Sequence, residues 1–411
     1  MLGLGQTTAK LARYRRQWNK FLASAKSSAG AEGGAPRTTI LPEQTGFGSN
    51  PGNLRMFTYV PAHLQPGAPL VVALHGCAQT AGGYDFGTGW SVLADRFGFA
   101  VLLPEQKRTN NPNTCFTWFA VENTMRDRGE ALSIRQMIAY METAHGIDRN
   151  RIYATGLSAG GAMTSVMLAT YPEVFAGGAI IAGLPYGSAT NVQEAFDAMF
   201  QGKVLPARAW GDLVRAASPH AGPWPKVSVW HGDADQTVKP ANADEIIKQW
   251  VDVHGLSAAP SLEMGVDGHR RRVWRDAAGE TMLEAYTIAG MAHGAPIDAA
   301  AACGHTAPFF LDAGISSTYR IAEFWGLTAA QAAESAERDL NGRRSPRSAS
   351  GRPTSTVVID QDGRVLDAEP DRAAESESAG EGNAADKGDW RSQLDPSSVI
   401  TKALRAAGLM K

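Results

Sequence analysis

Hydrophobic positions between residues 51 and 327 fall into short apolar runs that alternate with segments of helical spacing. Runs of four to eight apolar residues bounded by turn residues are typical of strands buried on both faces. The segment 54–60 alternates instead and predicts an early antiparallel strand. The further strands that we expect are 69–74, 99–103, 151–158, 174–182, 227–230, 271–275 and 282–288.

Helical spacing occupies the stretches between these runs. We expect helices over 90–97, 130–144, from residue 159 to 171, over 241–253 and over 308–325. Alternating strands and helices predict an α/β fold with a mostly parallel sheet covered by helices on both faces. In such sheets, ligands bind beyond the carboxyl ends of the strands.

The segments on either side of this zone have a different character. Residues 1–26 predict a basic amphipathic helix whose apolar stripe carries Tyr14 and Trp18, and residues 27–50 a linker. Residues 328–395 hold few large apolar side chains, so we expect a low-complexity and largely disordered tail. Residues 396–411 predict a short C-terminal helix, with Asp395 as its cap and Pro396 at its first position.

Composition narrows the possible functions. The chain has 411 residues, 44% of them hydrophobic, and a net charge of −2, which gives no indication of nucleic-acid binding. Its longest apolar stretch, 174–184, is too short to span a bilayer. Residues 1–26 lack the uninterrupted apolar core of a secretory signal, so we expect a cytoplasmic protein. Neither metal-ligand spacing nor a cofactor motif is found, and we expect no metal and no cofactor.

The strongest chemical motif is Gly156-Leu157-Ser158-Ala159-Gly160, which lies between a strand-like and a helix-like stretch. This context is typical of a nucleophile elbow, in which a serine on a strained turn projects its hydroxyl beyond the sheet. The two glycines are expected to pack where a Cβ would collide with neighbouring backbone. The sequence therefore predicts Ser158 as a nucleophile.

A serine nucleophile needs a base, and the base needs a carboxylate to orient it. The strand 227–230 runs into a loop with Asp233 and Asp235, and the strand 282–288 runs into a loop with His293. We favour Asp235 as the acid, because Asp233 suits the turn itself. His293 has the loop context and chain order of the base, while His231 is expected to hold the acid loop in shape. His305 is the nearest rival of His293.

The developing oxyanion would need backbone N–H donors. Ala159, directly after the serine, is expected to supply the first. The second should come from the loop after strand 69–74, where Gly76 permits a sharp turn and Cys77 presents its N–H. The three cysteines of the chain make no disulfide framework, and their general behaviour favours burial as small apolar side chains.

Together these motifs resemble the poly(3-hydroxybutyrate) depolymerase family of esterases, which is related to feruloyl and acetyl-xylan esterases of the same catalytic-domain type. The resemblance covers about residues 52–326. It is carried by the segments His75-Gly76-Cys77-Ala78-Gln79, Asn113-Thr114-Cys115-Phe116-Thr117-Trp118-Phe119, Gly156–Gly161 and His231-Gly232, and by His293. It implies an α/β-hydrolase fold, the triad Ser158, Asp235 and His293, and an oxyanion hole at Cys77 and Ala159.

The resemblance also implies further features of the site. In secreted members the early-loop cysteine can be disulfide-bonded, and Cys115 would be its partner here, whereas a cytosolic location would leave both thiols reduced. The segment after Cys115 is aromatic and lies in a polar loop at the expected rim. The substrate contacts that we expect are Trp118, first, with Phe116, Phe119 and Gln79.

The function implied is a serine esterase that hydrolyses poly- or oligo-(3-hydroxyalkanoate) esters through an acyl-enzyme. The alternative is a feruloyl or acetyl-xylan type carboxylesterase, and a more remote one is an inactive granule-binding protein on the same scaffold. The expected partners are a polyester or small ester substrate and a granule or lipid surface that residues 1–26 would contact. The alternatives for residues 1–26 are a helix docked on the chain's own catalytic domain and a frayed terminus. An extracellular location, as in secreted family members, is the alternative to the cytoplasm.

Overall fold

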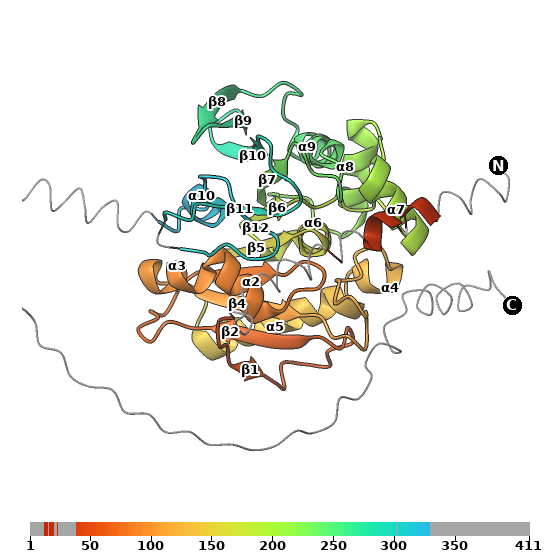
Figure 1. Cartoon of the computed structure of the whole chain (residues 1–411). Coiled ribbons are helices and arrows are strands. Elements are labelled where there is room, and N and C mark those ends of the chain that lie inside the picture. The colour runs from red at the N-terminus through yellow and green to blue at the C-terminus, as the bar shows by residue number, and fades with distance from the viewer. Residues whose placement is uncertain (1–11, 15, 20–22, 24–37, 302, 329–411) are drawn as a thin grey trace, which may run out of the picture. The chain divides into compact units, whose positions relative to one another are not determined.

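A ten-stranded β-sheet forms the centre of the computed structural model, which describes residues 12–14, 16–19, 23, 38–301 and 303–328 (Figure 1). All described residues fall within one compact unit. The strand order is β1-β2-β4-β3-β5-β6-β7-β10-β9-β8, with neighbours from β4 to β10 parallel and the outer pairs antiparallel. The strands are β1 (Glu43–Gln44), β2 (Arg55–Tyr59), β3 (Leu70–Leu74), β4 (Ala100–Glu105), β5 (Ile152–Leu157), β6 (Gly177–Ile181), β7 (Lys226–Gly232), β8 (Leu262–Val266), β9 (His269–Arg275) and β10 (Thr281–Ile288).

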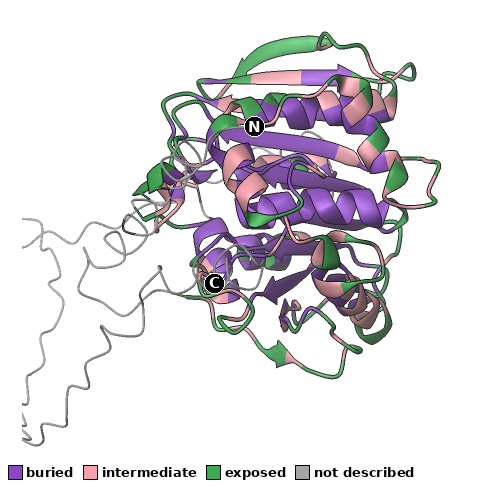
Figure 2. Cartoon of the chain, turned by 90° about the vertical axis from the view of Figure 1, so that its right-hand side faces the viewer, coloured by how far each residue is buried: buried purple, intermediate pink, exposed green. Residues whose placement is uncertain are grey.

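Helices cover both faces of this sheet. The helices are α2 (Ala81–Thr88), α3 (Trp90–Phe97), α4 (Val121–Thr124), α5 (Gly129–His145), α6 (Ala159–Thr170), α7 (Val192–Gln201), α8 (Ala207–Ala216), α9 (Ala241–His254) and α10 (Ser317–Phe324), with a 3₁₀ turn η1 (Pro172–Val174). Buried side chains of α5 to α9 belong to one hydrophobic core, and those of α2, α3 and α10 to a second. In Figure 2 the strands between these layers are buried, while exposed residues gather in outer turns and edges.

Strand β3 shows why the two cores form. All five of its residues are buried, and side chains alternate between the faces of a sheet. Leu70, Val72 and Leu74 lie in the first core, whereas Val71 and Ala73 lie in the second. A strand apolar at every position is therefore covered on both sides, as the continuous apolar run predicted.

The expected α/β class, the early antiparallel strand and the parallel strands are confirmed, but two boundaries were wrong. A single helix over 308–325 is replaced by β12 (Phe310–Asp312), which pairs with β11 (Ala295–Ile297), and by α10. The helix begins only at residue 317 because Ser316 caps it, its Oγ accepting the N–H of Tyr319 at 3.2 Å. The strand expected over 174–182 begins at Gly177, because Pro172 starts the preceding 3₁₀ turn.

The described residues of the N-terminal segment dock on α7. Residues 12–14 and 16–19 are helical, and Tyr14 is buried, its ring 5.2 Å from Phe200 and its hydroxyl donating to Asp197 at 2.5 Å. Trp18 meets Phe196 edge to face at 5.9 Å. The aromatic side of the expected amphipathic helix therefore packs on the chain itself. The parts of the segment in 1–11, 20–22 and 24–26, the linker over 27–37, the tail over 329–395 and the C-terminal helix over 396–411 lie outside the described residues.

Among the described residues, no helix is both long and apolar enough to cross a bilayer.

The turn that follows β5 depends on close backbone packing, as the motif predicted. A Cβ on Gly156 would lie 2.4 Å from the carbonyl oxygen of Gly160, and one on Gly160 would lie 2.1 Å from that of Leu74. These oxygens belong to the backbone of α6 and β3, so they cannot move away without shifting the helix or the strand. Glycine at both positions therefore lets the start of α6 approach the ends of β5 and β3.

We predict that Gly160→Ala lowers the free energy of unfolding by about 1–3 kcal/mol, because the added methyl group overpacks this contact. The matched control is Gly265→Ala in β8, where a Cβ would meet nothing within 4 Å. That control should change stability by less than about 0.5 kcal/mol. Chemical denaturation followed by circular dichroism measures both. Equal stability of the two variants would contradict the packing argument.

Candidate active site

Ser158 lies on a strained turn between β5 and α6. Its φ and ψ are 59° and −115°, a conformation that residues with a side chain rarely adopt. Its N–H donates to the carbonyl of Ile181 at 2.9 Å, which ties the turn to the carboxyl end of β6. Because the helix begins at the next residue, its free N–H groups and positive dipole end lie beside the serine. This is the geometry expected of a nucleophile elbow.

The expected acid and base are joined by a short hydrogen bond. His293 Nδ1 lies 2.7 Å from Asp235 Oδ2, and the carboxylate is fully buried. The other oxygen, Oδ1, accepts the backbone N–H groups of Thr237 at 2.7 Å and Val238 at 3.0 Å. Burial alone would raise the pKa of Asp235, but attraction to His293 and hydrogen bonds from His231 and His293 outweigh it, so this pKa lies below its ordinary value. Asp235 is therefore held ionised.

The two competing acids have separate environments. Asp233 is exposed, and its Oδ1 accepts the N–H of Gly290 at 2.7 Å, which ties the end of β7 to the loop after β10. His231 Nε2 lies 2.9 Å from the carbonyl oxygen of Val238 and 3.3 Å from Asp235 Oδ2. Both observations match the expected structural roles of the two residues. His305 is exposed and stacks on Phe86 at 4.5 Å.

Backbone contacts along one sheet edge bring the serine unit to the acid–base pair. Ala182 N–H donates to the carbonyl of Trp230 at 2.8 Å, and Asp233 N–H donates to that of Ile288 at 3.1 Å. The carboxyl ends of β5, β6, β7 and β10 therefore meet in register. The loop after β3 reaches the same edge from the other side of the serine. The ring of Phe309, which directly precedes β12, lies edge-on to the ring of His293, with 6.2 Å between the ring centroids.

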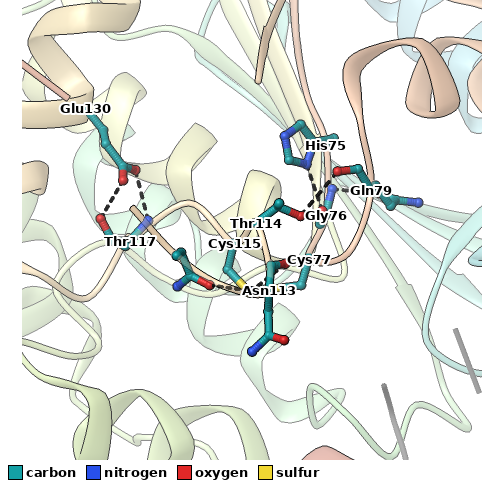
Figure 3. Close-up of a disulfide and its surroundings, with 10 residues drawn as sticks. His75, Gly76, Cys77, Gln79, Asn113, Thr114, Cys115, Thr117 and Glu130 are labelled. Atoms are coloured by element: carbon teal, nitrogen blue, oxygen red, sulfur yellow. Dashed lines mark hydrogen bonds between the residues drawn. A yellow bond between two sulfur atoms is a disulfide. The ribbon is translucent and has the colours of Figure 1, made fainter. Parts of the chain in front are cut away.

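The loop after β3 carries the expected second oxyanion donor, and a disulfide holds it (Figure 3). Cys77 is bonded to Cys115, which joins this loop to the one that follows β4. A Cβ on Gly76 would lie 3.6 Å from the Cβ of Ser158, so the loop passes directly beside the nucleophile. Within the described part of the chain, neither Cys77 N–H nor Ala159 N–H donates to a protein acceptor. The pairing that the resemblance implied is present, while Cys303 is a buried free thiol.

The aromatic segment divides into a buried part and a part at the rim. Phe116 has no exposed surface, and its ring packs 4.9 Å from that of His75. Phe116 therefore offers no exposed surface to a substrate in this structure, and its expected substrate contact stays a prediction. Trp118 retains 7% exposure and meets the half-buried Phe119 edge to face at 5.5 Å. Both remain candidates for the substrate wall.

Gln79 braces the loop. Its Oε1 accepts the N–H of Gly76 at 2.7 Å, and its Nε2 lies 3.5 Å from the carbonyl oxygen of Pro308. Because both the Oε1 and the Nε2 of this side chain contact the protein, Gln79 has less capacity to bind substrate. Its main effect is therefore on the shape of the loop.

Glu130 is a buried carboxylate beside the aromatic segment, and the sequence did not predict it as a residue of the site. Its carboxylate accepts the N–H and the hydroxyl of Thr117 at 2.9 and 2.6 Å (Figure 3). It also accepts the side-chain amide N–H of Gln106 at 2.6 Å. Burial raises its pKa to about 7, against the opposing effect of these hydrogen bonds. In the sequence it looks like an ordinary acid in the first turn of a helix, so nothing there distinguishes it.

In the ranges described, no cluster of three or more His, Cys, Asp or Glu side chains could hold a metal ion. The polar groups that the site does present are a serine, a carboxylate–histidine pair and two backbone donors.

A strained serine, a histidine and a buried carboxylate at one edge of a parallel sheet define a serine hydrolase of the α/β-hydrolase fold. The chain belongs to the family described as esterase PHB depolymerase, whose sequence model matches residues 56–272. It is a carboxylic ester hydrolase, since the curated sequence relatives that it matches are esterases and a depolymerase.

Three relatives illustrate this relationship. The chain is 47% identical over 291 residues to poly(3-hydroxyalkanoate) depolymerase C of Paucimonas lemoignei, and the aligned region covers 70% of each chain. It is 34% identical over 265 residues to feruloyl esterase B of Thermothelomyces thermophilus, covering 62% of this chain and 88% of the relative. Among solved structures, an acetyl xylan esterase from Aspergillus awamori matches with a TM-score of 0.60 and 25% identity, over 70% of this chain and 99% of that one.

We predict that Asp235→Asn lowers kcat on a soluble ester by about 10³–10⁴-fold, because the amide would favour the wrong tautomer of His293. Asp233→Asn keeps the oxygen that accepts the N–H of Gly290, so its kcat should stay within about threefold of wild type. Steady-state kinetics on p-nitrophenyl butyrate, with circular dichroism as the folding control, compares the two. Severe loss confined to the Asp233 variant would show that the acid is misassigned.

Proposed function

We propose that the chain hydrolyses poly- or oligo-(3-hydroxyalkanoate) esters through an acyl-enzyme on Ser158. The mechanism is supported by the hydrogen bond between His293 and the buried Asp235 at the sheet edge that carries the strained serine. The substrate class is carried by the 47% identity to a poly(3-hydroxyalkanoate) depolymerase over 70% of both chains.

Acylation begins when His293 Nε2 removes the proton from Ser158 Oγ and this oxygen attacks the ester carbonyl carbon. The N–H groups of Cys77 and Ala159 donate to the oxyanion that forms. Asp235 accepts the Nδ1–H of His293 and stabilises the imidazolium electrostatically, without taking its proton. The intermediate collapses as His293 returns the proton to the leaving alkoxide, which departs as an alcohol or a shortened polymer end.

Deacylation repeats these steps with water. His293 removes a proton from the water molecule, which attacks the acyl carbon, and the same two donors stabilise the second oxyanion. Ser158 then leaves with the proton that His293 returns, and a hydroxyacid is released. In this scheme Trp118 and Phe119 form an apolar wall for the acyl chain, because a hydrocarbon chain binds by losing contact with water.

The second candidate is a feruloyl or acetyl-xylan type carboxylesterase. This candidate is supported by the 34% identity to a feruloyl esterase, 88% of whose length is matched by this chain. The chemistry of the two candidates is the same.

We expect Ser158→Ala to lose about 10³-fold or more of its activity on p-nitrophenyl butyrate, because the binding and oxyanion contributions alone remain. The wild-type enzyme should release 3-hydroxyacid from amorphous polyhydroxybutyrate faster than it hydrolyses methyl ferulate or acetylated xylan at matched ester concentration. Product release measured by chromatography decides between the candidates. Preference for ferulate or xylan would replace the proposed substrate, and an active Ser158→Ala enzyme would remove the mechanism.

We propose that residues 1–26 bring the enzyme to a granule or lipid surface. The docking on α7 turns the aromatic side chains inward, but Arg13 and Arg16 are exposed and leave a basic face toward solvent. Basic residues near an anionic surface contribute roughly 1 kcal/mol each at physiological salt. As to location, the disulfide supports the extracellular alternative over the cytoplasm, because cytosolic thiols are kept reduced.

Removal of residues 1–26 should reduce the fraction of enzyme that sediments with anionic lipid vesicles or polymer granules by about tenfold at low salt. The double variant Arg13→Gln, Arg16→Gln keeps the docked aromatic residues and should reduce binding in the same direction. Its kcat on p-nitrophenyl butyrate should remain within about twofold of wild type. Sedimentation as complete as that of the intact chain would contradict the surface proposal.

A further inference from the structure

One buried carboxylate joins the two ends of the loop over residues 106–117, which follows β4. Glu130, in the first turn of α5, accepts the side-chain amide of Gln106 at 2.6 Å. It also accepts the N–H and the hydroxyl of Thr117 at 2.9 and 2.6 Å (Figure 3). Gln106 is the first residue after β4, and Thr117 directly precedes Trp118. The loop is therefore fixed to α5 at both of its ends.

The neighbours of Glu130 present donors to both of its oxygens. The amide of Gln106 and the N–H of Thr117 donate to it, and so does the Thr117 hydroxyl, whose own oxygen accepts from Asn123 Nδ2 at 2.7 Å. Among the described residues these partners include no cation. A carboxylate is the side-chain group that offers two acceptor oxygens and no donor. The contacts thus match an ionised Glu130, although burial raises its pKa to about 7 and makes ionisation costly.

Thr117 begins the turn that carries the two aromatic residues at the rim. Its carbonyl accepts the N–H of Ala120 at 2.9 Å, which closes a four-residue turn with Trp118 and Phe119 in the middle. Both rings pack in or against the first core. All three polar groups of Thr117 are hydrogen-bonded, and two of them bond to Glu130. The direction in which the turn leaves Thr117 is therefore set largely by Glu130.

The segment before this turn is anchored independently of Glu130. Cys115 is bonded to Cys77, and Phe116 has no exposed surface. These anchors hold the segment beside the loop that follows β3. We therefore expect a change at Glu130 to displace the turn more than it displaces the N–H of Cys77.

From this geometry we propose that Glu130 is a positioning residue that sets the acyl-chain preference of the enzyme by fixing, through Thr117, the turn that carries Trp118 and Phe119. This inference rests on the proposed function, in which those two rings form the wall for the acyl chain. Glu130 is 1% exposed, so it acts on a substrate only through its neighbours.

We expect Glu130→Gln to lower the ratio of kcat/KM for p-nitrophenyl butyrate to that for p-nitrophenyl acetate by about fivefold. The amide keeps the length of the side chain but places an NH₂ donor against the donors of Thr117 or Gln106. Butyrate carries two more methylene groups than acetate, and a displaced turn would bury them less well. The loss should appear as a higher KM for butyrate, with kcat on acetate within about threefold of wild type.

Glu122→Gln is the matched control, because it removes the same charge from an exposed residue of α4. Its ratio should stay within about twofold of wild type. A purely structural role of Glu130 would lower the active fraction, and with it kcat on both esters, without changing their ratio. An unchanged or higher ratio in folded Glu130→Gln enzyme would therefore overturn the proposal.

Thr117→Val tests the same contact if Glu130→Gln fails to fold. It removes the hydroxyl that donates to Glu130 and keeps the backbone N–H that does so. Its ratio should fall by about threefold. A folded Thr117→Val enzyme with an unchanged ratio would overturn the proposal.

Trp118→Ala completes a double-mutant cycle and separates this inference from the proposed function. The single variant should lower the ratio, and adding Glu130→Gln should then change it by less than about twofold, because both substitutions act on one contact. A further fivefold loss in that background would overturn the inference. If Trp118→Ala lowers the ratio and Glu130→Gln does not, the inference alone fails. If Trp118→Ala leaves the ratio unchanged, the proposed wall for the acyl chain fails as well.

Discussion

The close approach of backbone at the end of β5 is the constraint on which the site depends. Ser158 adopts a positive φ, and this turn is possible only because Gly160 lets α6 begin against the carbonyl oxygen of Leu74. The same contact brings the end of β3, and with it the loop of Cys77, beside the nucleophile. Ser158 and the N–H of Cys77, which we propose as an oxyanion donor, are therefore placed by one packing contact between adjacent parallel strands.

Electrostatics at the site follow from hydrogen bonds that are made before substrate arrives. Asp235 is buried, yet it remains ionised because two backbone N–H groups and two histidines surround it. A carboxylate that is prearranged in this way loses little by reorganisation when His293 becomes charged. In the loop after β3, His75 Nδ1 lies 2.8 Å from the carbonyl oxygen of Gly76 and its Nε2 accepts the N–H of Gln106 at 3.1 Å, so this loop too is held by hydrogen bonds made without substrate.

Much of the fold could be predicted because strands buried on both faces leave continuous apolar runs, as in β3 and β6. The motif of Ser158, the choice of Asp235 over Asp233 and the choice of His293 also depended on local chain chemistry. Elements with a weaker signal were missed. The strand β8 is mostly exposed, and α2 begins with Ala81-Gly82-Gly83, which is not typical of a helix.

The sequence alone determined where strands end, because apolar runs, glycines and turn residues act within a few positions of each other. It thereby placed Ser158, Asp235 and His293, the proposed nucleophile, acid and base, at strand ends. Tertiary structure alone decided which distant residues meet there: the bond of Cys77 with Cys115, the burial of Phe116 against His75, the carboxylate of Glu130 under Thr117, and the docking of Tyr14 on α7. These contacts depend on how strands and loops pack, and packing between segments far apart leaves no periodic pattern in either segment.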